Sequence, residues 1–493
     1  MPNSHPPPAH QRRARNSRDM PRRSRSSREY THDPKADATV PPHSSAGQKH
    51  HRGLHLPQYN HNGHRVTPGI QPDGESGRRG FHPFKFLQIC FRSNSFISKW
   101  VNLLWPIVPV AIALHFARPD LPLAIFVTNY IAMVPAANMV GFAGSEFARK
   151  LPKVLGVVVE TTFGSIVEII LFMVLLKTGG DQNVQVIRSA ILGSILANML
   201  LCLGFCFVAG GLLGGEQVFH EAVSEAGSGL MLVAGMGLVL PTIYYNALNG
   251  RTDLTIAGGE SEIADEMLKI SRATAIILLA AYLVFLFFQM KSHDNLFAEI
   301  YEADELVDKD RHEELAKPKL TLTECIVALV ISLACVSMIA VFLVLQIPYM
   351  VEERHISDAF VGLILIPVVE KFAEHLLAID EAYDGQMNLA LAHVLGASIQ
   401  TALLNTPLVI IVGWGLHINM DMKFEIFDSV SLILAILVVG SFLRDKKSNY
   451  LEGTLCIFVY LIIAVAAFYY PNPAGHGGGG GHGEEAAPAG EHH

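Results

Sequence analysis

The sequence predicts an all-α, polytopic membrane protein with about eleven transmembrane helices. One reason is composition, since 50% of the 493 residues are hydrophobic and only 17% are charged. The other is distribution: from about residue 100 to residue 470, apolar stretches of roughly 17 to 27 residues alternate with short polar breaks. Each stretch can cross a hydrocarbon core about 30 Å thick as a helix. These features exclude an ordinary soluble enzyme and make the lipid bilayer the expected partner.

The chain starts with a polar tail. Residues 1–98 are rich in Pro, Ser, His and Arg, and no short apolar run follows Met1. We therefore expect a disordered basic tail without a cleavable signal. The net charge of −8 does not favour nucleic acid as a partner, because the basic residues crowd this tail and the carboxylates lie in loops and within apolar segments.

The six cysteines are expected to be small core residues. Five of them lie within or at the edge of apolar segments, and Cys90 precedes the first segment. Their spacing matches neither a disulfide framework nor a zinc site.

The apolar segments form a pattern of one plus five plus five. A first helix over residues 99–117 precedes a group over residues 121–290, and an acidic loop over residues 291–319 leads to a second group over residues 320–470, followed by a Gly/His-rich tail over residues 471–493. The ten grouped segments are expected near residues 121–143, 153–177, 186–212, 226–246, 270–290, 320–346, 356–382, 388–415, 426–443 and 451–470. Because five is odd, two similar groups in series insert with opposite orientations, which is the inverted repeat of many secondary transporters.

Basic residues between the segments predict the orientation. With the basic tail in the cytosol, the loop over residues 291–319 and the basic clusters at 149–153 and 444–447 also fall on the cytosolic side. Eleven crossings then place the C-terminus on the opposite side of the membrane.

Two carboxylates lie within matching apolar segments. Glu168 ends a Gly-Ser-Ile-Val-Glu run in the second segment of the first group, and Glu374 lies in Glu-Lys-Phe-Ala-Glu-His in the second segment of the second group. A carboxylate in hydrocarbon is expensive, so each should face a cavity, a partner or a cation. A carboxylate that only joins two helices by hydrogen bonds is the alternative, and the duplication argues against it.

Further oxygen donors follow each carboxylate. Ser194 and Asn198 are four residues apart on one helix face, and Ser398 and Gln400 occupy the matching place in the second group. Carboxylate, hydroxyl and amide oxygens without a His-Cys cluster favour a hard cation such as calcium over zinc or copper. Interhelical packing by small and polar residues is the alternative for any one of them.

Six motifs in order along the chain carry a resemblance to a known family. They are Phe163-Gly-Ser-Ile-Val-Glu168, Leu192-Gly-Ser-Ile-Leu-Ala-Asn198, Gly362-Leu-Ile-Leu-Ile-Pro367, Ala373-Glu-His375, Leu395-Gly-Ala-Ser-Ile-Gln400 and Lys447-Ser-Asn-Tyr-Leu-Glu-Gly453. From about Trp100 to Tyr470 the chain resembles the cation/proton exchangers of the calcium/cation antiporter superfamily, in particular the fungal vacuolar calcium/proton antiporters.

The resemblance implies a secondary transporter rather than an enzyme, in the vacuolar membrane, with a luminal C-terminus. It implies no cofactor, only transported calcium and protons. Glu168 and Glu374 would bind the ion within motifs that include Gly164 and Ser165, and Ser194, Asn198, Ser398 and Gln400 would line its path.

The chain departs from the family pattern within both motifs. The family usually has Gly-Asn-Ala-X-Glu, whereas Ser165 replaces the first asparagine, Glu370-Lys371 replaces the second Gly-Asn, and Glu160 stands where an asparagine is more typical. If Lys371 pairs with Glu370 or extends away, the site keeps its attraction for a cation. If its ammonium pairs with Glu374 instead, it occupies the place of the transported ion and competes with it.

Other polar residues are candidates for proton relay, selectivity or cation access. His375 is expected to relay protons or to orient Glu374, with a satisfied core histidine as the alternative. Glu160, Glu370 and Lys371 are the other candidates for relay or selectivity. Cation access from the cytosol is assigned to Glu146, Glu302, Asp304 and Glu305, with a solvated linker as the alternative for the last three.

The sequence therefore predicts a vacuolar calcium/proton antiporter that works by alternating access. The alternative is a homologue that exchanges sodium, potassium or manganese for protons, or one that senses ions without transporting them. A membrane zinc protease is disfavoured, because Lys371 stands where His-X-X-Glu-His requires a ligand histidine. The oligomeric state is open, with a homo-oligomer as one option.

Overall fold

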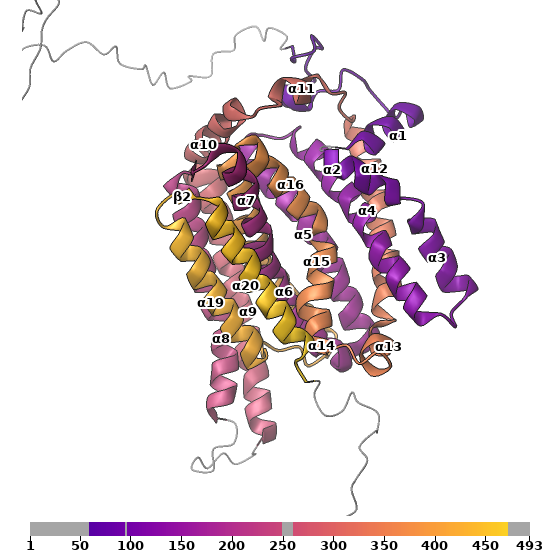
Figure 1. Ribbon diagram of the computed structural model, residues 1–493, viewed down its shortest axis with the longest axis vertical. Helices are drawn as coiled ribbons and strands as arrows, with labels where there is room; N and C mark the ends of the chain where they lie inside the picture. The colour runs from indigo at the N-terminus through magenta and orange to yellow at the C-terminus, as the bar shows by residue number, and fades with distance from the viewer. Residues whose placement is uncertain (1–58, 94–95, 249–259, 472–493) are drawn as a thin grey trace, which may run out of the picture. The chain divides into compact units, whose positions relative to one another are not determined.

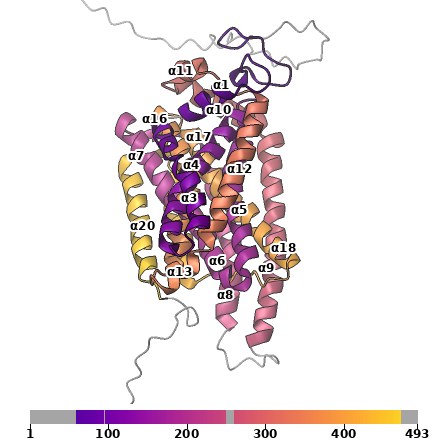
Figure 2. The same ribbon diagram turned by 90° about the vertical axis from the view of Figure 1, so that its right-hand side faces the viewer.

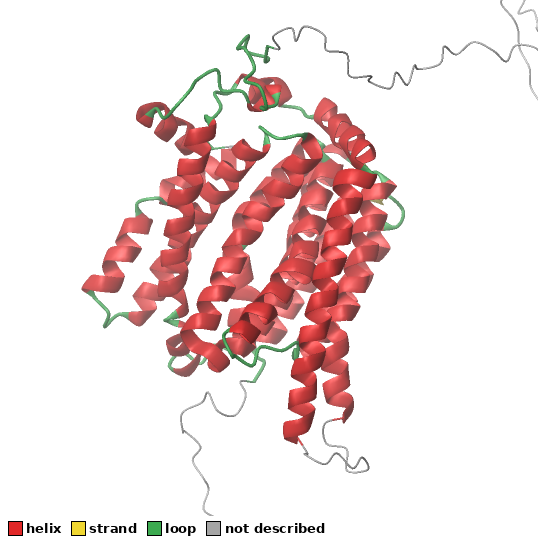
Figure 3. Ribbon diagram, turned by 180° about the vertical axis from the view of Figure 1, so that it is seen from behind, coloured by secondary structure: helices red, strands yellow, loops and turns green. Residues whose placement is uncertain are grey.

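The computed structural model describes residues 59–93, 96–248 and 260–471. Figure 3 shows that this part of the chain is almost entirely helical, with short connecting loops. Within it, ten helical segments are long and apolar enough to cross a membrane. The prediction of an all-α, multi-pass membrane fold is confirmed. The expectations for residues 1–58 and 472–493 lie outside the described residues.

The first half of the chain contributes a short N-terminal segment, one crossing and five further crossings. The helices are α1 (Pro83–Arg92), α2 (Phe96–Val101), α3 (Ile107–Ala117), α4 (Pro122–Ala148), α5 (Lys153–Gly179), α6 (Val184–Leu196), α7 (Leu203–Gly214), α8 (Glu221–Leu248) and α9 (Glu260–Phe287), with strand β1 (Gln217–Val218) after α7. Helices α6 and α7 form one crossing, because a π-helical turn over Ala197–Cys202 joins them.

The second half repeats this plan after two short helices. The elements are α10 (Asp294–Val307), α11 (Arg311–Ala316), α12 (Leu322–Val344), α13 (Ile347–Glu352), α14 (Asp358–Phe360), α15 (Ile366–Glu370), α16 (Phe372–Asp384), α17 (Met387–Gln400), α18 (Thr406–Gly415), α19 (Ile426–Leu443), β2 (Lys447–Ser448) and α20 (Tyr450–Phe468). A π-helical turn over Thr401–Asn405 joins α17 to α18, at the place that matches the turn between α6 and α7. Turns of this kind are frequent at functional sites.

The crossing expected over residues 356–382 is not one continuous helix. It consists of α14, a π-helical turn over Val361–Leu365, α15 and α16, with a break at Lys371. Figure 1 shows these pieces following one another along the bundle, beside α5. This broken crossing is not among the ten spans, which accounts for the difference from the eleven expected crossings.

The N-terminal segment is ordered from Tyr59, so the prediction of disorder as far as residue 98 is wrong for its described part. The segment lies at the end of the bundle that carries α10 and α11 (Figure 1). Arg78 pairs with the buried Glu324 at 3.1 Å, and the Lys150 ammonium donates to the carbonyl of Gly74 at 2.6 Å. These contacts with distant residues order a segment whose own composition would not fold it.

The two halves pack against each other along several helix pairs. Helix α4 lies along α12, as Figure 2 shows, and α7 lies along α20. At the second of these contacts, a side chain on Gly453 would begin 2.5 Å from the carbonyl oxygen of Gly204. Beside it, β1 and β2 pair antiparallel, with Gln217 opposite Ser448.

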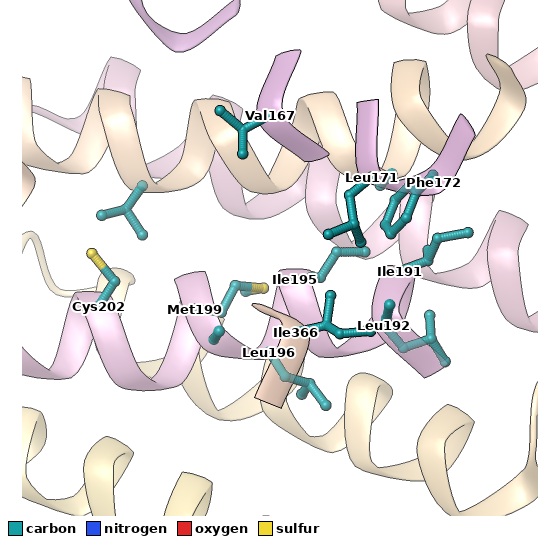
Figure 4. Close-up of a cluster of buried hydrophobic side chains, with 14 of the residues drawn as sticks. Val167, Leu171, Phe172, Ile191, Leu192, Ile195, Leu196, Met199, Cys202 and Ile366 are labelled. Carbon is teal, nitrogen blue, oxygen red and sulfur yellow. The ribbon is translucent and has the colours of Figure 1, made fainter. Parts of the chain in front are cut away.

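A buried hydrophobic cluster fills the space between α5, α6 and α15 (Figure 4). Its members are almost fully buried, and they include Val167, Leu171, Phe172, Ile191, Leu192, Ile195, Leu196, Met199, Cys202 and Ile366. Five of the six cysteines, all except the half-buried Cys335, are buried, and all six are free, as expected. The cluster joins residues of α5, α6 and α15, next to the polar residues described below.

Candidate functional site

Glu168 lies on α5 at the contact between the two halves. Its side chain is fully buried. One carboxylate oxygen accepts hydrogen bonds from the Thr401 hydroxyl and from the Asn405 side-chain amide, each at 2.8 Å. Both donors belong to the π-helical turn between α17 and α18, so the second half of the chain orients a carboxylate of the first half.

Glu374 reaches the same place from the second half of the chain. It lies in the first turn of α16, where the helix dipole stabilises a negative charge. Its side chain is 18% exposed. It rests on Gly164 of α5 so closely that a β-carbon at that position would overlap its carboxylate. Gly164 therefore provides the space that the Glu374 carboxylate occupies.

The Lys371 ammonium lies between these two carboxylates. Its nitrogen is 2.9 Å from a carboxylate oxygen of Glu168 and 3.2 Å from one of Glu374, and the side chain is 1% exposed. Of the two sequence-based alternatives for Lys371, the structure has the one in which it pairs with Glu374. The pairing with Glu168 was not predicted.

Further polar contacts join the two halves around this point. The Ser165 hydroxyl donates to the side-chain oxygen of Gln400 at 2.9 Å, and the amide nitrogen of Gln400 donates to Thr161 at 2.8 Å. His375 and Asn198 form a hydrogen bond of 3.0 Å between Nε2 and Oδ1. Residues predicted from two distant sets of motifs are thus brought together at one place.

The two predicted serines behave differently. The Ser398 hydroxyl donates to the carbonyl of Val394 in its own helix at 2.9 Å, so it is turned toward the backbone. The buried Ser194 hydroxyl has no hydrogen-bond partner among the described residues. The role of both serines in a cation path stays a prediction.

Glu160 stands at a junction of cavities. It lines two small cavities of about 40 and about 30 Å³ that reach Glu374, and also a larger one of about 200 Å³. Its carboxylate accepts from Ser145, and it lies 3.6 Å from Nε2 of His393. The other ring nitrogen of His393 is 2.7 Å from Glu381.

The larger cavity, here called the vestibule, opens at the end of the bundle that carries α10 and α11. Its acidic lining residues are Asp73, Glu160, Glu305, Asp308, Asp310, Glu314, Asp380, Glu381 and Asp384. Its basic lining residues are Arg149, Lys153, Arg311 and Lys319. The excess of carboxylates gives it an attraction for cations.

The four predicted access residues include only one that lines the vestibule, Glu305. Glu146 is buried and accepts from the backbone nitrogen of Leu320 at 2.7 Å, just before α12. Asp304 is buried and accepts from the backbone nitrogen of Leu389 at 2.9 Å. Glu302 is exposed outside the vestibule. Glu146 and Asp304 lie outside the vestibule and accept hydrogen bonds from backbone groups near helix starts, so the structure shows a capping contact for both.

Burial and neighbouring charges shift the pKa values of several groups around the vestibule. The Arg149 guanidinium is 2.9 Å from Glu314, which raises the pKa of the arginine and lowers that of the carboxyl. Burial lowers the pKa of Lys319 to about 8 and raises that of Asp308 to about 6. Carboxylate oxygens of Asp308, Asp310 and Asp384 lie within 4.8 Å of one another at this rim.

Several polar residues at the site were missed in the sequence. Thr401 and Asn405 follow Gln400 and are four residues apart, so their shared face could have been read as a continuation of the second motif. Glu381 and His393 lie on two successive helices, and no local spacing joins them.

The chain is similar to known proteins over most of its length. A profile of the family described as "Sodium/calcium exchanger protein" matches residues 121–291 and 325–469, more than half of the chain. The "Vacuolar cation/proton exchanger 5" of Arabidopsis thaliana is 34% identical over 383 residues, which cover 76% of this chain and 82% of that protein. The "Vacuolar calcium ion transporter" of Schizosaccharomyces pombe is 32% identical over 377 residues, which cover 76% of this chain and 86% of that one.

Solved structures support the fold. The Ca²⁺/H⁺ antiporter protein YfkE, in selenium-substituted form, has a TM-score of 0.58 at 22% identity, with 76% of this chain and 99% of that chain covered. The H⁺/Ca²⁺ exchanger CAX has a TM-score of 0.53 at 12% identity, with coverage of 76% and 92%.

Proposed function

Because the chain belongs to the sodium/calcium exchanger protein family, we propose that it is a calcium/proton antiporter of the vacuolar membrane. It is a secondary active transporter, which uses a proton gradient to move cytosolic calcium into the lumen. The names of its relatives, which include vacuolar exchangers from plants and a fungal vacuolar calcium transporter, support this assignment.

The observation that carries the proposal is the meeting of Glu168 and Glu374 at one cation position. The two carboxylates come from corresponding crossings of the two halves and approach the same nitrogen, at 2.9 and 3.2 Å. Inverted repeats of secondary transporters place their substrate at such an interface, near the middle of the membrane. Oxygen ligands of this kind suit calcium.

Protons and calcium exchange by competition for these carboxylates. A buried carboxylate holds a proton readily, and a divalent cation that binds it favours the ionised form. Binding of calcium therefore releases protons, and return of protons releases calcium. Alternating exposure of the site to the two sides turns this competition into exchange.

The vestibule is the proposed access route from the cytosol. Its acidic lining attracts cations, and Glu160 connects it with the cavities at Glu374. The basic N-terminal tail supports a cytosolic position for this end. Helix α20 ends at the opposite end of the bundle from α10 and α11, which fits a luminal C-terminus (Figure 1).

The test is proton-gradient-driven uptake of radioactive calcium into sealed vesicles that contain the protein. We expect Glu374→Gln to abolish uptake, because it removes one of the two charges of the site. Glu302→Gln is the matched control, since Glu302 is exposed and outside the vestibule, and it should transport like the wild type. Equal uptake by Glu374→Gln and the wild type would refute the proposed site.

A second candidate function follows from the position of Lys371. An ammonium that never leaves the cation position would give a protein that exchanges another cation, such as sodium, potassium or manganese, or that binds ions without transport. Uptake of one of these cations without calcium uptake, or calcium binding without exchange, would identify it.

A further inference from the structure

Lys371 places a positive charge of the protein itself where the two halves are arranged to attract a cation. The ammonium bridges Glu168 of the first half and Glu374 of the second, and it is 1% exposed. In this state the site is filled without any transported ion. Calcium can bind both carboxylates only if the ammonium moves.

Glu370, the residue before Lys371, offers a second partner. Its side chain is 2% exposed, and neither carboxylate oxygen has a hydrogen-bond partner among the described residues. A buried carboxylate without partners is costly, so it gains from an approaching cation. Glu370 also lines the cavity of about 40 Å³ that Glu374 lines, so the two glutamates border a common space.

Together, the three carboxylates and the ammonium have the net charge that one divalent cation neutralises. Glu168, Glu370 and Glu374 carry three negative charges when ionised, and Lys371 carries one positive charge. Two negative charges remain after Lys371 has been paired with any one carboxylate. The Glu370-Lys371 pair therefore leaves the capacity of the site for one divalent cation unchanged.

We infer that Lys371 is a tethered cation that fills the empty site, moves to Glu370 when a divalent cation binds, and thereby excludes monovalent cations. This inference rests on the proposed antiport. Lys371 is the specificity-determining residue, and Glu370 is the positioning residue that receives it.

The selectivity for divalent over monovalent cations follows from the attachment of the ammonium to the chain. A group held by the chain beside its partners competes at a high effective concentration and loses little freedom when it binds. Sodium and potassium carry the same single charge as the ammonium, so they gain no electrostatic advantage that would displace it. A calcium ion carries twice the charge, and its attraction to two carboxylates at short range exceeds that of the ammonium.

The experiment measures calcium uptake into sealed vesicles with and without sodium or potassium. Glu370→Gln removes the second partner, so Lys371 stays between Glu168 and Glu374, and we expect the KM for calcium to rise by roughly fivefold or more. Glu370→Gln with Lys371→Gln removes both charges and should restore the KM. Sodium and potassium should then inhibit the double variant by roughly fivefold or more, and leave the wild type unaffected. Lys371→Arg is the control that keeps the charge, and it should remain insensitive to sodium.

Two results would overturn the inference. One is a double variant with a KM no better than that of Glu370→Gln, which would indicate a structural role for the pair. The other is a double variant that resists sodium and potassium as the wild type does.

A second measurement separates this inference from the proposed function. If no variant moves calcium, the antiport proposal fails, and the melting temperature of the purified proteins still tests Lys371. Sodium should raise the melting temperature of the double variant and leave that of the wild type unchanged, because only the variant has an open position for a monovalent ion. An equal response of the two proteins to sodium would refute the inference.

Discussion

Gly164 and Glu374 are in direct contact across the interface between the two halves. The contact is so close that any side chain at position 164 would occupy the space of the carboxylate. The glycine of the first motif therefore determines where the carboxylate of the second motif lies, although the two residues are more than 200 positions apart.

Gly164→Ala should reduce calcium uptake without unfolding the protein. The added methyl group displaces the Glu374 carboxylate, and a misplaced site group reduces rates by on the order of tenfold or more. The measurement is vesicle uptake together with the melting temperature of the purified protein. Gly440→Ala in α19 is the control, because a side chain there meets no atom within 4 Å. Unchanged uptake by Gly164→Ala would show that the position of Glu374 does not limit transport.

Thr401→Val should weaken calcium binding. Valine keeps the shape of threonine and removes the hydroxyl that donates to Glu168 at 2.8 Å. A hydrogen bond to a charged group contributes about 1.5–3 kcal/mol, so the KM for calcium should rise by about tenfold or more. Thr454→Val is the matched control, since the half-buried Thr454 donates to the carbonyl of Tyr450 in its own helix and lies away from Glu168. If both variants have the wild-type KM, Thr401 does not orient Glu168 for binding.

Arg78→Ala should destabilise the protein. It leaves the fully buried Glu324 without its ionic partner, although the backbone nitrogens of His82 and Thr321 still donate to that carboxylate. The remaining donors reduce the loss to about 1–3 kcal/mol. Thermal unfolding in detergent should show the lower stability. Arg79→Ala is the control, because Arg79 is the exposed neighbour, and equal melting temperatures of the two variants would refute the role of the pair.

Asp308→Asn should stabilise the protein at neutral pH and not at acidic pH. Burial raises the pKa of Asp308 from 3.8 to about 6, so its ionisation opposes folding. The stability that the protonated form provides is complete below the unfolded pKa and is lost as the pH rises through about 6. The difference in melting temperature between variant and wild type should therefore grow between pH 4 and pH 6 and stay constant above. A difference independent of pH would contradict this assignment.

The hydropathy pattern predicted the helices because burial in lipid requires long, continuous apolar runs. It also identified Glu168 and Glu374 as candidate site residues, because a carboxylate within an apolar segment is costly unless it faces a cavity, a partner or a cation. The crossing that contains Glu374 was expected to be continuous, and the structure interrupts it at Lys371.

The direction of a side chain was not predictable from spacing. Lys371 lies one residue from Glu370 and three from Glu374, whereas its contact with Glu168 joins residues that are about 200 positions apart in the sequence. From the sequence, Glu146 and Asp304 were expected to be free carboxylates. In the structure each accepts a hydrogen bond from a backbone nitrogen far along the chain. The order of residues 59–93 likewise comes from partners far along the chain, which composition does not reveal.

The pairing of β1 with β2 limits how the two halves can move relative to each other when the site changes its exposure from one side of the membrane to the other. The strands connect the loop after α7 with the loop before α20, and Gly204 and Gly453 bring the two helices together at backbone distance just beside them. Shear along this seam would break the strand pairing and force backbone atoms into each other. Helices α7 and α20 should therefore move as a single body, so that any rocking motion between the halves has its pivot at this seam and its largest displacement far from it.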